Sequence, residues 1–189
     1  LTDVTGVQTC ALPIWPLAVE QPFTRSVRVR PTAFRPPDEP HPDARIQFHR
    51  LYDALVADDE RNGLIVEDIA DAIREGRSPI VLTERTDHLR RLTERLAPLV
   101  PRLFVLQGGM SRTCLRETLA QIGSVPPEEA RLLLATGRFV GEGFDDARLD
   151  TLFLTLPVSW RGTITQYAGR LHRLHEGKSD VRIYDYADL

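Results

Sequence analysis

From Pro79 onward, short runs of consecutive apolar residues alternate with segments that have helical spacing. Such continuous apolar runs, bounded by polar loops, are typical of strands that are buried on both faces of a sheet. Strands that are separated by helices predict an α/β fold with a mostly parallel sheet, covered on both faces. The expected strands are Ile80–Leu82, Leu103–Leu106, Arg131–Thr136, Leu152–Leu156 and Val181–Tyr184.

Helical spacing marks the segments between these strands. One helix is expected to begin near Thr86, and a second to cover Arg112–Ile122. A third begins after Thr163, because Thr163 and Gln166 have the spacing of a capping box. The apolar residues that the first helix is expected to turn inward are Leu89, Leu92, Leu96 and Leu99.

The part of the chain before Pro79 is less regular. Residues 2–14 have no periodicity and resemble a translated sequencing-adapter remnant, so we exclude them from the fold prediction. Val27–Arg30 alternates and predicts a short edge strand, and the proline-rich segment Pro31–Pro42 predicts a linker. The expected organisation is an artefactual segment (1–14), a linker with a short strand (15–45), a helical segment (46–76) and a C-terminal α/β domain (77–189).

The helical segment is expected to contain two amphipathic helices. Apolar residues with helical spacing run from Phe48 to Val56 and again from Leu64 to Ile73. The polar residues Asp58–Gly63 predict a break between the helices, and Gly76 is expected to close the second.

Composition limits the classes of function. The 189 residues have 42% hydrophobic and 27% charged residues, as in an ordinary globular protein, and a formal net charge of -3. A nucleic-acid surface would therefore have to be a local patch. Cys10 and Cys114 make neither a disulfide framework nor a metal cluster, and no apolar run reaches transmembrane length. We expect no metal site, no membrane partner and a cytoplasmic location.

The third helix carries the pattern Q-x-x-G-R-x-x-R, formed by Gln166, Gly169, Arg170 and Arg173. These residues fall on one face of the helix, so two planar, always-charged guanidinium groups lie beside a glycine that permits close approach. This arrangement suits a polyphosphate, although a basic face in contact with solvent has the same pattern. The opposite, apolar face consists of Ile164, Tyr167, Ala168, Leu171 and Leu174.

Four segments in order resemble the motifs of the second RecA-like domain of superfamily-two helicases. They are Pro79–Arg85 (fourth motif), Leu106–Met110 (the glycine turn that follows it), Ala135–Asp145 (fifth motif) and Gln166–Arg173 (sixth motif). The likeness is greatest to bacterial DEAD/DEAH-type and restriction-type DNA helicases and to helicase subunits of conflict systems. The resemblance covers about two thirds of the chain and implies a RecA-like three-layer sandwich.

The resemblance also implies roles for the motif residues at the nucleotide. Arg173 and Arg170 would reach the triphosphate of ATP on a partner domain, with Arg173 as the arginine finger. Gln166 would couple the nucleotide to the partner domain, and Gly143 and Asp145 would approach the ribose. From the pattern alone, Asp145 could equally cap a turn, and Gly143 could merely permit a loop.

Nucleic-acid contacts are implied at the ends of three strands. Thr136 would hold a phosphate, and Thr83 and Gly108 would make weaker backbone contacts to the strand. Without the resemblance, Thr136 is an ordinary strand-end residue. His172 and His175 belong to no set of metal ligands and are interpreted as surface residues or phosphate neighbours.

A phosphate-binding loop of the pattern G-x-x-x-x-G-K-[ST] does not occur in the sequence. Gly177-Lys178-Ser179 imitates its end, but the position of the first glycine is His172, and a strand follows instead of a helix. We therefore expect the chain to be the C-terminal motor half of an ATP-dependent DNA helicase or translocase. ATP and Mg²⁺ would be held by an N-terminal RecA-like half, and the fragment alone would have negligible ATPase activity. The alternatives are a non-catalytic interaction module derived from a helicase domain and, less favoured, an unrelated nucleotide-sugar or flavin binder.

Overall fold

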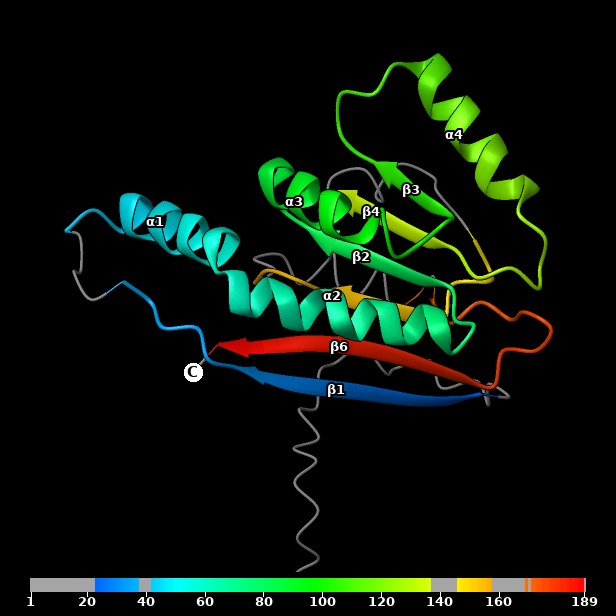
Figure 1. Cartoon of the computed structure of the whole chain (residues 1–189), viewed down its shortest axis with the longest axis horizontal. Coiled ribbons are helices and arrows are strands. Elements are labelled where there is room, and N and C mark those ends of the chain that lie inside the picture. Colours follow the sequence, from blue (N-terminus) through cyan, green and yellow to red (C-terminus); the bar gives the residue numbers. More distant parts are fainter. Residues whose placement is uncertain (1–22, 38–41, 137–145, 158–168, 170, 189) are drawn as a thin grey trace, which may run out of the picture.

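The computed structural model describes residues 23–37, 42–136, 146–157, 169 and 171–188. Within them, six strands form one sheet in the order β1-β6-β5-β2-β4-β3, and every neighbouring pair is parallel (Figure 1). The α/β class and the parallel sheet are thus confirmed. The strands are β1 (Thr24–Thr32), β2 (Pro79–Thr83), β3 (Leu103–Leu106), β4 (Leu132–Thr136), β5 (Thr151–Leu154) and β6 (Asp180–Asp188).

Helices cover both faces of this sheet, which gives the three layers of a RecA-like sandwich. Helices α2 and α3 pack on one face, and α4 with the segment around Leu171 packs on the other. Helix α1 lies at one end of the sheet (Figure 1). The helices are α1 (Ala44–Ala57), α2 (Asp59–Arg74), α3 (Thr86–Leu96) and α4 (Arg112–Ser124).

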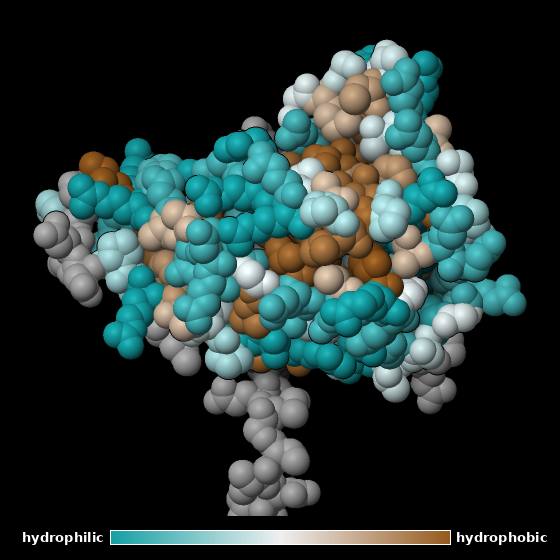
Figure 2. All heavy atoms as spheres, viewed as in Figure 1, coloured by the Kyte–Doolittle hydropathy of each residue, from teal (hydrophilic) through white to brown (hydrophobic). Residues whose placement is uncertain are grey.

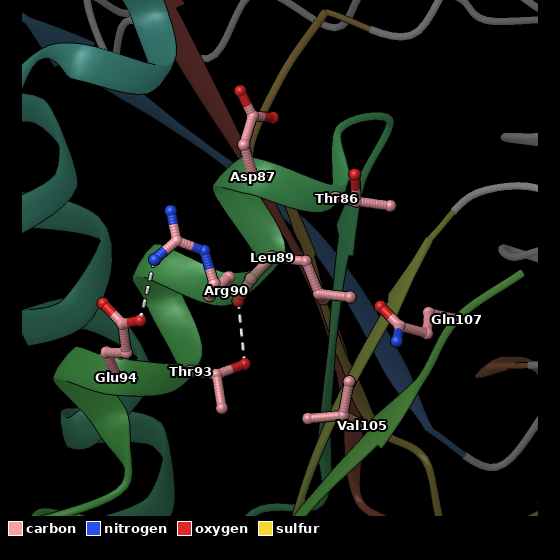
Figure 3. Close-up of a pocket in the computed structure, with 8 residues that line it drawn as sticks. All are labelled: Thr86, Asp87, Leu89, Arg90, Thr93, Glu94, Val105 and Gln107. Atoms are coloured by element: carbon pink, nitrogen blue, oxygen red, sulfur yellow. Dashed lines mark hydrogen bonds and ion pairs between the residues drawn. The ribbon is translucent and has the colours of Figure 1, made fainter. Parts of the chain in front are cut away.

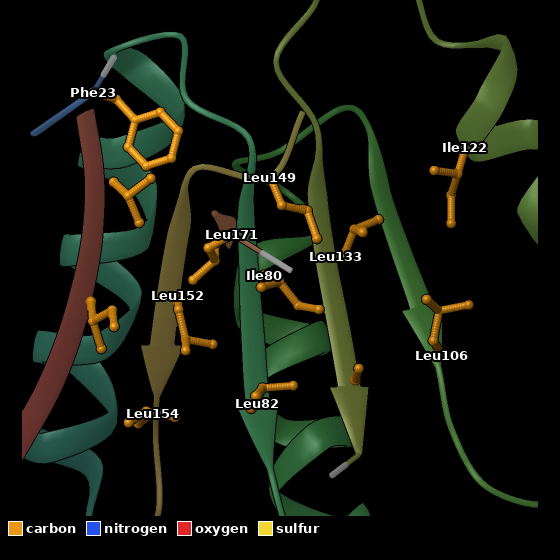
Figure 4. Close-up of a cluster of buried hydrophobic side chains, with 13 residues drawn as sticks. Phe23, Ile80, Leu82, Leu106, Ile122, Leu133, Leu149, Leu152, Leu154 and Leu171 are labelled. Carbon is orange, nitrogen blue, oxygen red and sulfur yellow. The ribbon is translucent and has the colours of Figure 1, made fainter. Parts of the chain in front are cut away.

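Two apolar clusters, one on each face, hold these layers together. Every residue of β2, β4 and β5 is buried, as expected for central parallel strands. Alternate residues point to opposite faces. Leu152 therefore joins the cluster beneath α4 (Figure 4), whereas Phe153 joins the cluster beneath α2 and α3. Phe153 is also stacked on Tyr184 of β6, with ring centroids 4.4 Å apart. Fully burying one such side chain stabilises the fold by roughly 1.5–3 kcal/mol.

Helix α2 packs in the same core as the later strands, and β1 forms an exposed edge of the sheet beside β6. The pairing of β1 with β6 runs from Thr24 opposite Asp180 to Thr32 opposite Asp188, so the strand is longer than the predicted Val27–Arg30. The first two residues of the expected linker, Pro31 and Thr32, therefore lie in β1.

Two expectations about helix boundaries are wrong. No polar break separates the first two helices over Asp58–Gly63: only Asp58 lies between them, because its carboxylate caps α2 by accepting a hydrogen bond from the Arg61 N–H at 2.7 Å. Leu99 does not face inward on α3, since the helix ends at Leu96, ahead of Pro98, and Leu99 is 53% exposed. Val100 is buried in the cluster beneath α3 instead. The predicted closure at Gly76 is confirmed by its positive φ of 76°.

Candidate functional site at the carboxyl ends of the strands

The carboxyl ends of all six strands meet at one edge of the sheet because every pair is parallel. The three residues predicted to contact nucleic acid come together there. Thr83 at the end of β2 is the register partner of Thr136 at the end of β4. The N–H of Gly108, in the turn after β3, donates a hydrogen bond to Oγ1 of Thr136 at 3.2 Å. The structure therefore forms one cluster from residues that are far apart in the sequence.

The Thr83 hydroxyl is held by a chain of buried hydrogen bonds. Its Oγ1 lies 3.0 Å from Nδ1 of His88, and Nε2 of His88 lies 2.8 Å from Oδ1 of Asn62. The Asn62 side-chain amide donates to the carbonyl of Val56 at 2.9 Å, which fixes Oδ1 toward the imidazole. His88 is thus assigned as the Nε2–H tautomer, whose Nδ1 accepts a hydrogen bond from the Thr83 hydroxyl.

These hydrogen bonds require that the imidazole of His88 is neutral. Burial of His88, followed by the charge of Arg61, lowers the pKa of His88 to about 3. Thr83 donates to His88 and accepts from the Arg85 N–H at 3.3 Å, so its hydroxyl is engaged on both sides. In this state Thr83 organises the turn from β2 to α3. A contact from its hydroxyl, or from the Gly108 N–H, to a phosphate requires an existing hydrogen bond to open.

A buried arginine fixes α2 to the same edge. Arg61 is 2% exposed and pairs with Asp188 at the end of β6, with Nε 2.7 Å from Oδ1. Its Nη1 donates to the carbonyl of Thr155, just after β5, at 2.7 Å. The guanidinium also lies 5.7 Å from the ring centroid of Tyr186.

Sequence reasoning did not identify Arg61, Asn62 or His88. The first two lie in the segment that was expected to be a break, where only their helical phase relative to the buried Ile65 could have shown that they face inward. The signal for His88 was its place beside the inward-facing Leu89 on the same helix.

The end of the predicted arginine-bearing helix is fixed by Lys178. Gly169 and Leu171 are helical, but His172 and Arg173 lie in the turn that follows, so the prediction that the helix continues through Leu174 is wrong. The Lys178 ammonium donates to the carbonyls of Leu171 at 3.1 Å and Arg173 at 2.9 Å, and in this way satisfies carbonyls at the helix end. Burial lowers the pKa of Lys178.

The end of this helix lies between a buried leucine, Leu171, and an exposed arginine, Arg173. Leu171 is 1% exposed and packs in the core as predicted, whereas Leu174 is 63% exposed instead of joining the apolar face. Arg173 is exposed. Gly169 is exposed as well, and a Cβ placed there would meet no heavy atom within 4 Å apart from its own neighbours in the helix. Arg173 therefore lies on a surface turn whose backbone is fixed on both sides. The other residues predicted at the nucleotide, Gly143, Asp145, Gln166 and Arg170, lie outside the described residues.

The histidines near this turn have different surroundings. His172 is half-buried and stacks on Phe23, with ring centroids 6.1 Å apart, whereas His175 is exposed. Burial, followed by the charges of Arg25 and Lys178, lowers the pKa of His172. Over the described residues, no group of three His, Cys, Asp or Glu side chains could hold a metal ion. None of the described helices has the length and apolar character that crossing a membrane requires.

A groove of about 540 Å³ lies between α3 and the edge strand β3. On this side of the molecule, hydrophobic side chains are visible between the helices and beside β3 (Figure 2). Leu89 and Val105 point into the groove, while Asp87, Arg90 and Glu94 line its polar side (Figure 3). Arg90 is paired with Glu94 at 3.1 Å, and Asp87 is paired with Arg85 at 3.3 Å, so the guanidinium that lines the groove is already neutralised. The groove is therefore a poor site for a polyphosphate.

Comparison with known structures identifies the fold. The chain matches the structure of T4 UvsW (TM-score 0.63, 14% identity, 88% of this chain and 32% of that chain). It also matches the C-terminal part of the Fun30 ATPase domain (TM-score 0.57, 14% identity, 74% and 46%). A third match is domain 2 of the DEAD-box helicase Mss116p bound to an RNA duplex (TM-score 0.56, 13% identity, 88% and 55%). No protein-family model and no curated protein sequence matches the chain.

The fold is thus the RecA-like α/β fold that these three structures have. The chain spans between 32% and 55% of the length of these three structures. At identities of 13–14%, the likeness concerns the fold, and the roles of individual residues rest on the site itself.

Proposed function

We propose that this chain is the C-terminal motor half of an ATP-dependent DNA helicase or translocase. An N-terminal RecA-like half of the same parent protein holds ATP and its Mg²⁺. The observation that carries the proposal is the exposed Arg173, whose backbone is fixed between the buried Leu171 and the ammonium of Lys178. A guanidinium on a fixed turn suits a group that must reach a phosphate on another domain.

In this proposal Arg173 is the arginine finger. It approaches the γ-phosphate and stabilises charge on the transferring phosphoryl group, and Arg170 contacts the same triphosphate. Gln166 couples the nucleotide to the N-terminal half, and Gly143 and Asp145 approach the ribose. Closure of the two halves around ATP assembles this site, and hydrolysis allows it to open.

The nucleic acid runs along the carboxyl edge of the sheet. Thr136, Thr83 and Gly108 form one cluster there, and phosphate contacts at such a cluster position a strand without reading its sequence. We propose DNA as the polymer. The Mss116p domain, which has the same fold, is bound to an RNA duplex, so binding is to be compared for both polymers.

A second candidate is a non-catalytic nucleic-acid or protein interaction module. It is favoured by the internal engagement of the Thr83 hydroxyl and the Gly108 N–H, which leaves the Thr136 hydroxyl as the one donor of this cluster that can reach a phosphate without breaking a hydrogen bond. The exposed Arg173 favours the motor half, because a scaffold does not require an arginine on a fixed turn.

ATP hydrolysis tests the proposal and separates the two candidates. The chain alone, the N-terminal half alone and the two joined as in the parent protein are assayed for phosphate release with single-stranded DNA or RNA present. We expect no turnover by the chain alone and rapid turnover only by the joined halves. Turnover by the chain alone would contradict the division of roles. Equal rates with and without the chain would favour the interaction module.

A further inference from the structure

Helix α1 has an anchored half and a projecting half. Tyr52, Leu55 and Val56 are buried, with exposed fractions of 5%, 1% and 4%. Every residue from 42 to 50 is exposed, and this part of the helix stands away from the sheet (Figure 1). The side chains in the first two turns of α1 therefore face solvent and do not pack in the core.

The anchored half places α1 at the carboxyl edge. The Tyr52 hydroxyl donates to the carbonyl of Pro157, which follows β5, at 2.5 Å. Tyr52 also shares an apolar cluster with Phe34, which follows β1. Asp53 pairs with Arg85, in the turn after β2, at 2.5 Å. The projecting half thus stands at the edge that carries Thr83.

The projecting half carries two arginines, Arg45 and Arg50, and one carboxylate, that of the N-cap residue Asp43. Among the residues that the structure describes, the side chain of Arg45 makes no hydrogen bond or ion pair. Arg112 and Arg116, in the first turns of α4 after β3, have the same property. Exposed arginines without partners thus lie near both ends of the carboxyl edge, where they favour a polyanion.

An exposed aromatic side chain lies beside one of these arginines. Phe48 is 48% exposed, and its ring is held 4.4 Å from that of the buried Tyr52. Arg45, Phe48 and His49 have the i, i+3 and i+4 spacing of a common helix face, whereas Arg50 lies on the opposite side. A fixed aromatic ring next to a guanidinium can stack on a base while the arginine contacts a phosphate.

We propose that the face of α1 formed by Arg45, Phe48 and His49 binds a single strand of nucleic acid that extends beyond the carboxyl edge. Arg45 contacts a backbone phosphate, and Phe48 stacks on an unpaired base. This surface lies outside the segments that resemble helicase motifs, and it lengthens the nucleic-acid path of the proposed function, on which it rests.

Fluorescence anisotropy with a labelled single-stranded DNA or RNA oligonucleotide, measured over a series of salt concentrations, tests the inference on the whole chain. Phe48→Ala is expected to weaken binding about fivefold or more through the loss of stacking. Arg45→Ala is expected to reduce the slope of log affinity against log salt by about 0.7. Arg50→Ala removes the same charge from the opposite face of the helix and is expected to leave the slope unchanged.

The outcomes separate this inference from the proposed function. If the unmodified chain binds but Phe48→Ala and Arg45→Ala bind equally well, or if Arg50→Ala matches Arg45→Ala, the inference is overturned and the proposed function stands. If the unmodified chain binds neither polymer, the nucleic-acid contact of the proposed function fails as well. Phe48→Leu keeps apolar packing against Tyr52 but removes the ring, so it is expected to lose affinity without loss of stability.

Discussion

The neutral His88 makes a quantitative prediction about pH. Its pKa in the folded chain is about 3, whereas an unperturbed histidine has a pKa of about 6.5. The unfolded chain therefore takes up a proton that the folded chain refuses as the pH falls through about 6.5. Stability that is present above this value is lost on acidification toward pH 3. Stability falls by about 1.4 kcal/mol per pH unit only below about pH 6.5. The expected loss of unfolding free energy between about pH 7 and pH 5 is therefore about 2 kcal/mol.

Urea unfolding at these two pH values measures the loss. His88→Gln retains an N–H near the position of Nε2 but cannot titrate. Between about pH 7 and pH 5, its free energy of unfolding is therefore expected to fall by about 2 kcal/mol less than that of the unmodified chain. Other titrating groups contribute equally to both proteins and cancel in the difference. His49→Gln, at an exposed position of α1, is the matched control and should keep the full loss. An equal fall for His88→Gln and the unmodified chain would refute the assignment of a buried, neutral imidazole.

Three further predictions concern the packing that supports the site. Arg61→Met should cost about 3–5 kcal/mol in urea unfolding, because a carboxylate at the end of β6 loses its partner, whereas Arg74→Met at an exposed pair should cost under about 1 kcal/mol. Leu152→Ala should cost about 2–5 kcal/mol, and Leu99→Ala, at an exposed position, about 0.5 kcal/mol or less. Lys178→Met should cost about 1–3 kcal/mol and should slow ATP turnover by the joined halves, because three backbone carbonyls lose their donor. Equal losses of unfolding free energy for Arg61→Met and Arg74→Met, or for Leu152→Ala and Leu99→Ala, would contradict these assignments. Unchanged ATP turnover for Lys178→Met would do the same.

The sequence predicted the sheet well because its central strands are continuous apolar runs that only burial on both faces explains. It failed where polar residues are buried through specific partners. Arg61 and Asn62 looked like part of a loop, and their role depends on a carboxylate and an imidazole contributed by distant segments. The extent of β1 was equally hidden, since Val27 and Val29 on this edge strand remain about half exposed.

The candidate site could be predicted only in part. Motif order placed Thr83 and Thr136 at strand ends, and the parallel register then made them neighbours. The sequence could not show that the Thr83 hydroxyl is engaged by His88, nor that Lys178 ends the helix before Arg173. Both facts depend on side-chain contacts that no spacing rule encodes.

The single-turnover rate of ATP hydrolysis by the parent protein, compared between Arg173 and Arg173→Ala, tests the central claim most directly. An arginine finger acts on charge in the transition state, so the rate should fall on the order of a thousandfold. Affinity for ATP should change much less. Arg102→Ala, an exposed arginine paired with Glu129 at 2.9 Å, is the control and should keep the full rate. A normal rate for Arg173→Ala would contradict the assignment of this chain as the half that supplies the finger.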